Sequence, residues 1–264
     1  MKGICLSGLI FLAACVQEVE KVPAVPVVEG RVEFDHDHPG LAKVLKEVVH
    51  LGLVDYGKLL RHRDPLNAYL VRAALVSREN FDQWTRAERM AFLLNVYNAT
   101  TMLLLADHHP VKSIKDISTL PPVWKLKVVR LFGKKLSLDD VEHGMIRKQF
   151  ESPQIHFALV CGARSCPPLR EEPYTPKRLE AQFADQARSF LADKGKNYVD
   201  MEAKVVHLSP IFKWYARDFG KDDDALLKFI SPHLNKEQSR AVEAGGFKVS
   251  YTDYDWSLNE AFQK

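Results

Sequence analysis

The segment from residue 86 to residue 107 constrains the fold most, because it is predicted to be one long helix that is apolar on every side. Thr85 and Glu88 form a capping box, a pattern that opens a helix. At about 100° per residue, large apolar side chains then point in all directions around the axis. They are Phe92, Leu93, Leu94, Val96, Leu103 and Leu104. A helix that is apolar all round is buried, so we expect this one in the interior of a domain.

The other periodic segments are shorter, and most of them are helical. Residues 123–136 alternate between apolar and charged side chains and turn at Gly133, which predicts a β-hairpin. Residues 155–160 are a short apolar run that we interpret as a strand. Helices are expected at 40–52, 66–80, 137–150, 176–193, 225–234 and 235–244, and from Ser209-Pro210 onward. This order is not a βαβ alternation, so the predicted fold class is α+β: a helix-rich single domain with a small, mainly antiparallel sheet.

The first fifteen residues have the pattern of a bacterial lipoprotein signal peptide. Lys2 precedes an apolar run that is too short to cross a hydrocarbon core of about 30 Å as a lasting helix. Leu12-Ala13-Ala14-Cys15 then matches the lipobox at which such peptides are cleaved. The alternatives are an ordinary secretory signal that happens to contain Cys15, or an N-terminal stub. On the lipoprotein interpretation, residues 1–15 are the signal peptide, which ends at the lipid-acceptor Cys15.

Residues 16–30 contain two prolines and a glycine without a helical or strand period, so they are expected to form a tether. Residues 31–264 are then the single globular domain. Val16-Gln17 lacks the aspartate that typically retains such proteins at the inner membrane. We therefore expect a cell-envelope protein that is lipid-anchored in the outer membrane and faces the periplasm.

Charge and cysteine content narrow the partners of the domain. The chain has 37 Lys and Arg against 34 Asp and Glu, a net charge of +3, which falls by one to +2 when Lys2 leaves with the signal peptide. This near-neutral balance argues against nucleic acid as a partner. The expected partners are the membrane, through the N-terminal lipid, and an unknown envelope substrate or protein. Cys5 leaves with the signal and Cys15 carries the lipid, so only Cys161 and Cys166 remain for the domain.

Several segments together resemble a bacterial and plant family called domain of unknown function 547 (DUF547). They are AFLLNVYNAT (91–100), LSLDDVEHGMIRKQF (136–150), IHFALVCGARSCPPLREEPYTPKRLEAQ (155–182), LSPIFKWYARDF (208–219) and DWSLN (255–259). The resemblance is collinear over about 85–260 and implies a shared fold, but no activity is established for the family. Plant members often have Ser-Asp-Pro where this chain has Ser165-Cys166-Pro167, which implies that a disulfide here is not a family-wide feature.

Asn95 and Asn98 are candidate site residues on the long apolar helix. They lie about 60° apart around the helix axis and therefore share a face. A buried carboxamide without a partner costs about 1–3 kcal/mol, so both must find hydrogen bonds inside the protein or at a cleft. The first interpretation is a structural network that ties loops to the helix, and the second is the floor of a polar cleft.

Glu142 and His143 stand early in the helix expected at 137–150. His143 lies on a flank of the apolar stripe, so it is predicted to be half-buried, which tends to keep an imidazole neutral and available as a base. Glu142 is about 100° away, too far round to orient its neighbour's ring easily, and is expected to point toward the hairpin or the long helix. The alternative is a core histidine bonded to a backbone carbonyl.

Cys161 and Cys166 can be interpreted in two ways that exclude each other. Exported proteins meet an oxidising compartment, so a Cys161–Cys166 disulfide is one possibility. The other is a Cys161 thiol nucleophile activated by His143, with Asn95, Asn98 or Glu142 orienting the imidazole. Backbone N–H groups of the turn at 162–165 could then stabilise an oxyanion. An oxidised sulfur cannot attack a carbonyl, so only one of the two holds in the mature protein unless Cys166 acts as a resolving partner.

The remaining patterns do not predict a metal or a cofactor. His143, His156, Cys161 and Cys166 are zinc-compatible, but the C-x₄-C spacing is looser than in a zinc knuckle and no HExxH occurs. Phosphate-loop, GxSxG and dinucleotide-binding patterns do not occur either, so no cofactor is expected. Aromatic residues near the C-terminus are interpreted as structural. They are Phe212, Trp214 and Tyr215 in the core, and Trp256 as a plug between the caps Asp255 and Asn259.

These patterns lead to two hypotheses of different classes. The first is an envelope thiol-dependent hydrolase or acyl transferase acting on amide or ester bonds, with Cys161 as nucleophile and His143 as base. The second is a non-enzymatic binding or assembly lipoprotein, in which a Cys161–Cys166 disulfide is structural.

Overall fold

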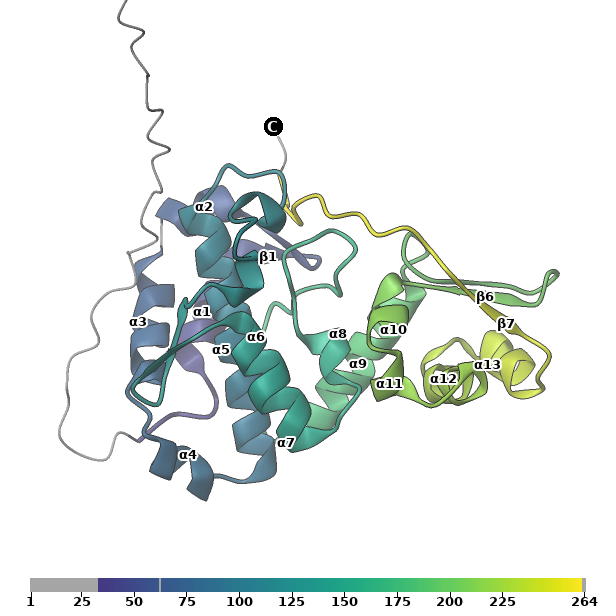
Figure 1. Ribbon diagram of the computed structural model, residues 1–264, viewed down its shortest axis with the longest axis horizontal. Coiled ribbons are helices and arrows are strands. Elements are labelled where there is room, and N and C mark those ends of the chain that lie inside the picture. The colour runs from purple at the N-terminus through teal and green to yellow at the C-terminus, as the bar shows by residue number, and fades with distance from the viewer. Residues whose placement is uncertain (1–32, 62, 263–264) are drawn as a thin grey trace, which may run out of the picture.

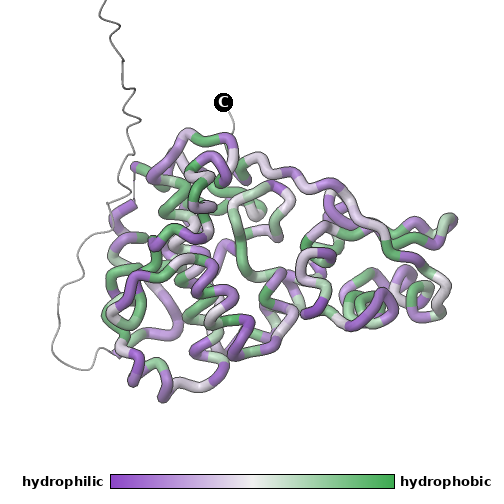
Figure 2. The backbone as a smooth tube through the Cα atoms, viewed as in Figure 1, coloured by the Kyte–Doolittle hydropathy of each residue, from purple (hydrophilic) through white to green (hydrophobic). Residues whose placement is uncertain are grey.

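The computed structural model describes residues 33–61 and 63–262. The expected signal peptide, Cys15 and the tether lie outside these residues. The described chain is a helix-rich α+β domain with small sheets, as predicted. Figure 1 shows a larger lobe, built from the first half of the chain, beside a smaller lobe formed by the second half. Figure 2 shows hydrophobic segments in both lobes, and each lobe has its own cluster of buried apolar residues.

The larger lobe is arranged around α5 (Arg86–Asp107), whose predicted bounds and capping box are confirmed. Among the described helices, only α5 is long and apolar enough to span a membrane, and 94% of that stretch is buried in the domain. Its neighbours contact it from several sides. The elements of this lobe are α1 (Pro39–Val48), β1 (Val49–His50), β2 (Leu53–Val54), α2 (Tyr56–Arg61), α3 (Asp64–Ala74), α4 (Arg78–Gln83), η1 (Ile114–Asp116), η2 (Val123–Lys125), β3 (Val129–Leu131), β4 (Lys134–Leu136), α6 (Leu138–Val141), the π-helical turn η3 (Glu142–Arg147), α7 (Lys148–Phe150) and α8 (Ile155–Ala158).

The smaller lobe packs short helices against a three-stranded sheet. The strand order is β5–β6–β7, with β5 antiparallel and β7 parallel to β6. The elements are α9 (Leu179–Ala192), β5 (Tyr198–Asp200), β6 (Val205–Leu208), α10 (Pro210–Trp214), α11 (Ala216–Phe219), α12 (Asp223–Ile230), η4 (Ser231–His233), α13 (Lys236–Glu243) and β7 (Lys248–Tyr251). Ser209 caps α10 as expected from Ser209-Pro210.

After β7 the chain returns to the larger lobe as an extended segment, residues 252–262, which we call the strap (Figure 1). Its far end forms two backbone hydrogen bonds with Val54. The Val54 N–H donates to the Asn259 carbonyl, and the Val54 carbonyl accepts the N–H of Ala261. The Asn259 side chain is buried and accepts the hydroxyl proton of Tyr56 at 2.7 Å. Asn259 is therefore a buried anchor of the strap, not the helix cap that was expected.

Two of the shorter predicted elements have a definite outcome. The hairpin is confirmed, although its strands occupy only residues 129–136 and residues 123–125 form a helical turn. The strand expected at 155–160 is wrong, because Ile155–Ala158 is the helical turn α8. A short apolar run is compatible with either a buried strand or a buried helical turn, so its periodicity does not distinguish them.

The helical turn α8 joins the two lobes. Ile155 and Ala158 belong to the apolar cluster of the larger lobe. Phe157, on the same turn, belongs to the cluster of the smaller lobe, where its ring lies 5.8 Å from those of Phe190 and Phe212. One turn of helix therefore places side chains in both cores.

We expect Phe157→Ala to lower the free energy of unfolding by about 3–5 kcal/mol, the usual cost of removing a buried phenyl ring. Urea unfolding followed by circular dichroism measures the change. The matched control is Leu120→Ala, a side chain that is 90% exposed and should change stability by less than about 0.5 kcal/mol. Equal effects of the two substitutions would show that Phe157 does not join the lobes.

Candidate functional site

A pocket of about 260 Å³ lies where the two lobes and the strap meet. The larger lobe supplies polar and sulfur-bearing side chains, whereas α10, Tyr215 and the strap supply mainly aromatic ones. Its lining consists of Tyr97, Trp124, Asp139, Glu142, His143, His156, Leu159, Cys161, Cys166, Ile211, Trp214, Tyr215, Tyr254 and Trp256. Three of the five predicted catalytic residues, Cys161, His143 and Glu142, are therefore brought to one pocket.

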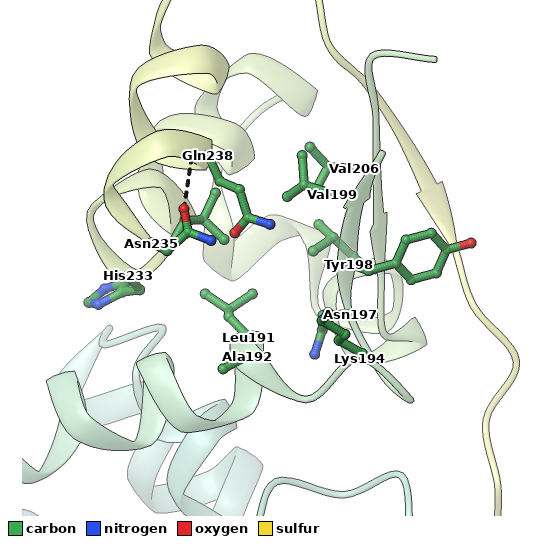
Figure 3. Close-up of a pocket in the computed structure, with 12 residues that line it drawn as sticks. Leu191, Ala192, Lys194, Asn197, Tyr198, Val199, Val206, His233, Asn235 and Gln238 are labelled. Carbon is green, nitrogen blue, oxygen red and sulfur yellow. Dashed lines mark hydrogen bonds between the residues drawn. The ribbon is translucent and has the colours of Figure 1, made fainter. Parts of the chain in front are cut away.

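A larger pocket, of about 420 Å³, lies wholly in the smaller lobe (Figure 3). It is enclosed by the end of α9, the β5–β6 hairpin and the start of α13, with Leu191 and Val206 among its apolar side chains and Gln238 among its amides. No cysteine or carboxylate is among the described residues that line it. Size therefore does not identify the reactive site, and the chemistry of the lining favours the cysteine pocket.

The two cysteines form a hydrogen-bonded pair of free thiols. The Cys166 sulfur accepts the backbone N–H of Cys161 at 3.0 Å and also the Cys161 thiol. The Tyr254 hydroxyl lies 3.4 Å from the Cys161 sulfur, and the backbone N–H of Ala163 is directed at both sulfurs. Backbone N–H groups that converge in a turn form a site for an anion, here a thiolate.

These hydrogen-bond donors shift the pKa values of the two thiols in opposite directions. The hydrogen bond to Cys166, followed by burial, raises the pKa of Cys161. Burial raises the pKa of Cys166 too, but the hydrogen bonds that it accepts from Cys161, Tyr254 and the backbone outweigh this, so its net pKa is lowered. The pair therefore holds its first negative charge on Cys166. The oxyanion site expected from the turn is not confirmed, because the N–H groups of Arg164 and Ser165 donate to the strap and that of Ala163 to the sulfurs.

Asn98 positions the backbone that leads into Cys161 and does not itself line the pocket. Its side chain donates to the Ala158 carbonyl and accepts the N–H of Val160, both at 2.9 Å. Asn95 makes the same pair of hydrogen bonds: it donates to the Tyr174 carbonyl and accepts the Tyr174 N–H. The structural interpretation of the two amides therefore agrees with their contacts. Of the two, only Asn98 binds backbone that immediately precedes Cys161.

The cysteine turn begins at Gly162, whose conformation requires glycine. Its φ of +83° lies in the left-handed region, and a Cβ there would come within 2.3 Å of the Leu105 side chain on α5. The other side of the turn is tied to the strap, since Arg164 donates to the Ser257 carbonyl and Ser165 to the Asp255 carbonyl. The sulfurs therefore lie on a turn that is fixed from both sides.

Glu142 is a buried carboxyl group at the polar side of the pocket. It accepts the hydroxyl of Tyr215 at 2.8 Å and that of Tyr97 at 3.2 Å, so it points toward the long helix α5 as expected. Burial raises its pKa. Contrary to expectation, Glu142 is close enough to contact its neighbour's ring, because its Oε1 atom lies 3.7 Å from His143 Nδ1. The two residues begin the π-helical turn η3, which departs from the regular helix used for the sequence argument.

His143 lies at the rim of the pocket, with 43% of its side chain exposed. Arg147 Nη1 lies 3.1 Å from Nδ1 of His143. A guanidinium can only donate, so Nδ1 is the acceptor and the proton of the neutral ring is on Nε2. Arg147 is held in this place by two 2.7 Å bonds to Asp218. The ring therefore presents an N–H donor from Nε2, and the expected role as a base is not the one that this geometry favours.

His156 was noted in the sequence only as a possible metal ligand. It lies on α8, stacks on Tyr215 with ring centroids 3.9 Å apart and contacts Asp218 at 2.6 Å. Burial lowers its pKa to about 4, although the hydrogen bond that it donates to Asp218 opposes the shift. Within residues 33–61 and 63–262, no three His, Cys, Asp or Glu side chains are grouped as metal ligands.

The sequence argument missed the aromatic part of the site. Phe212 is a core residue as predicted, but Trp214 is 49% exposed at the pocket and Tyr215 binds Glu142. Trp256 lines the pocket and does not plug the domain. The only signal that could have pointed to them is the density of aromatic residues near the C-terminus, which is equally typical of a core.

Comparison with known proteins identifies part of the chain. Residues 81–191 match the family model described as "Protein of unknown function, DUF547", so this segment is similar to that family. The searches of curated proteins and of solved structures found no match. The matched segment includes both cysteines, Glu142 and His143, whereas Trp214, Tyr215, Tyr254 and Trp256 follow it in the sequence. The pocket is therefore completed by residues beyond the family match.

We expect one thiol of the pair to react with iodoacetamide at a pH below the ordinary cysteine range, because hydrogen bonds lower the pKa of Cys166. Cys161→Ala removes the thiol donor and should raise the pKa of Cys166, whereas Cys161→Ser keeps a hydroxyl donor and should preserve more of the lowering. The rate of alkylation against pH measures this in a Cys5→Ser, Cys15→Ser background. Identical profiles for the two variants would contradict a thiol–thiolate pair.

Proposed function

We propose that this protein is a thiol-dependent hydrolase or acyl transferase that acts on amide or ester bonds, with Cys161 as the nucleophile. The observation that carries the proposal is the pair of free thiols whose negative charge is stabilised by backbone and hydroxyl donors inside a pocket. A thiolate is the reactive form of cysteine, and here the donors place the first negative charge on Cys166, which is proposed to act as the base that deprotonates Cys161.

In the proposed step, Cys161 attacks because it is the more exposed of the two sulfurs. Its proton passes along the hydrogen bond to the Cys166 thiolate as the sulfur–carbon bond forms, and the electron pair of the carbonyl moves to oxygen. When the tetrahedral intermediate collapses, the bond to the amine or alcohol breaks and Cys166 returns the proton to that leaving group. Water, or an acceptor amine or alcohol, then takes the acyl group from Cys161 in the same sequence.

His143 is proposed to stabilise the oxyanion through its Nε2 proton. Arg147 donates to Nδ1, which leaves Nε2 as the nitrogen that carries a proton and can donate it. A neutral imidazole that polarises a carbonyl is known from other enzymes. Glu142 lies 3.7 Å from Nδ1 and accepts the hydroxyl of Tyr215, which it holds in place. In this proposal Cys166 replaces His143 as the base.

We expect the purified protein to hydrolyse 4-nitrophenyl butyrate with an initial burst and to show a butyryl adduct by intact mass spectrometry. Cys161→Ala should abolish both. His143→Gln should lower kcat by about 10²–10³-fold, the usual effect of removing one oxyanion donor. Cys166→Ala should move the acidic limb of the pH–rate profile to higher pH, because the nucleophile then loses its base.

The control variant is Cys5→Ser, Cys15→Ser, which leaves only the cysteine pair. A turnover rate that Cys161→Ala does not change, or the absence of an adduct with every activated ester tested, would remove the hydrolase proposal and favour a binding or assembly protein.

We also propose that the chain is a lipoprotein of the cell envelope, anchored through Cys15 in the outer membrane and facing the periplasm. The support is the lipobox Leu12-Ala13-Ala14-Cys15 and the absence of aspartate after it. Two or more acyl chains on one cysteine are enough for stable anchoring, since a single chain binds a bilayer only marginally.

Cys15→Ser should therefore abolish incorporation of an alkyne-labelled palmitate and move the protein out of the membrane fraction of a double-membraned bacterium. Cys5→Ser is the matched control, since Cys5 lies within the expected apolar run and should not alter labelling. Labelling that survives Cys15→Ser would contradict the anchor.

A further inference from the structure

Four aromatic side chains form a continuous surface on one side of the cysteine pocket, and we call it the aromatic wall. Trp214 and Trp256 stack at 24° with centroids 5.7 Å apart. Tyr254 contacts both, at 4.8 and 4.5 Å, and Trp124 meets Trp256 edge-on at 5.9 Å. The wall joins η2 of the larger lobe, α10 of the smaller lobe and the strap.

The wall begins at the reacting sulfur. The Tyr254 hydroxyl lies 3.4 Å from the Cys161 sulfur, and the ring of the same tyrosine contacts the two stacked tryptophans. A group attached to a carbonyl carbon that Cys161 attacks would therefore extend along these rings. The same pocket is also lined by the polar side chains of Asp139, Glu142 and His143.

Part of the pocket's hydrogen-bonding capacity is already used within the protein. Both oxygens of Glu142 accept tyrosine hydroxyls, and the hydroxyl of Tyr254 is engaged with sulfur. Leu159 and Ile211 add aliphatic surface to the lining.

We infer that the aromatic wall is the acyl-binding subsite and that it selects substrates with an uncharged, apolar acyl group larger than acetyl. The inference rests on the proposed function and adds the substrate class to it. Apolar surface that leaves water gains free energy roughly in proportion to its area, so each added methylene that contacts the wall should improve recognition about fourfold. Because three of the four wall residues, Trp214, Tyr254 and Trp256, follow the DUF547 match, acyl selection is assigned to the C-terminal part of the chain.

The first arm of the test is a series of 4-nitrophenyl esters: acetate, butyrate and hexanoate. The expected result is a rise in kcat/KM of at least tenfold from acetate to hexanoate in the wild-type protein. Trp214→Ala should flatten the series, since the exposed indole forms the outer part of the wall. The matched control is Tyr198→Ala, an exposed aromatic side chain that lines the larger pocket and should leave the series unchanged. A series that is flat in the wild type would overturn the inference.

The second arm measures binding without chemistry, so that it separates the two proposals. Three of the four tryptophans belong to the wall, and the fourth, Trp84, packs on Phe92 in the larger lobe. A Trp84→Phe, Cys161→Ser protein therefore reports on the wall through its fluorescence when hexanamide is added. Saturable change that Trp214→Ala abolishes supports the subsite even if no ester is hydrolysed, in which case only the proposed function fails. A response to chitotriose but not to hexanamide, or a response to neither, overturns the acyl assignment.

Discussion

The docking of α8 between the two lobes is the constraint on which the site depends. Phe157 enters the aromatic core of the smaller lobe, and its neighbour His156 contacts Asp218 of α11. Asp218 in turn holds Arg147, which reaches back to His143. Apolar packing thus fixes how the lobes meet. A series of hydrogen bonds between charged side chains then positions His143 at the pocket rim. The same turn leads directly into Cys161, so one of the contacts that join the lobes also positions the cysteine turn.

The strap gives the site its second fixed boundary. It accepts hydrogen bonds from the cysteine turn at Arg164 and Ser165, and it delivers Tyr254 to the sulfur and Trp256 to the wall. One extended segment therefore positions the thiols and supplies part of the surface that faces them. Its far end is anchored through Asn259 and Tyr56 in the larger lobe, so the sulfur turn is held between α5 and the strap.

Local patterns predicted the parts of the fold that local interactions determine. The Thr85 capping box gave the start of α5, and the all-round apolar character gave its burial. The nature of α8 was missed, because a short apolar run buried by two lobes has no period that identifies it. The sequence identified only those pocket residues whose side chains are reactive by type, namely Cys161, Glu142 and His143. Its aromatic half comes from separate segments whose convergence depends on tertiary packing, and no spacing in the sequence encodes that.

The environment of the sulfurs also bears on the disulfide, which stays a prediction. The donors from the backbone of Cys161 and Ala163 and from Tyr254 stabilise a negative charge on Cys166. A disulfide carries no such charge and would gain little from them, so these contacts stabilise the reduced pair relative to the oxidised one. Dithiols whose reduced form is stabilised in this way are strong oxidants and give up their disulfide readily. The thiolate site itself therefore opposes a Cys161–Cys166 disulfide.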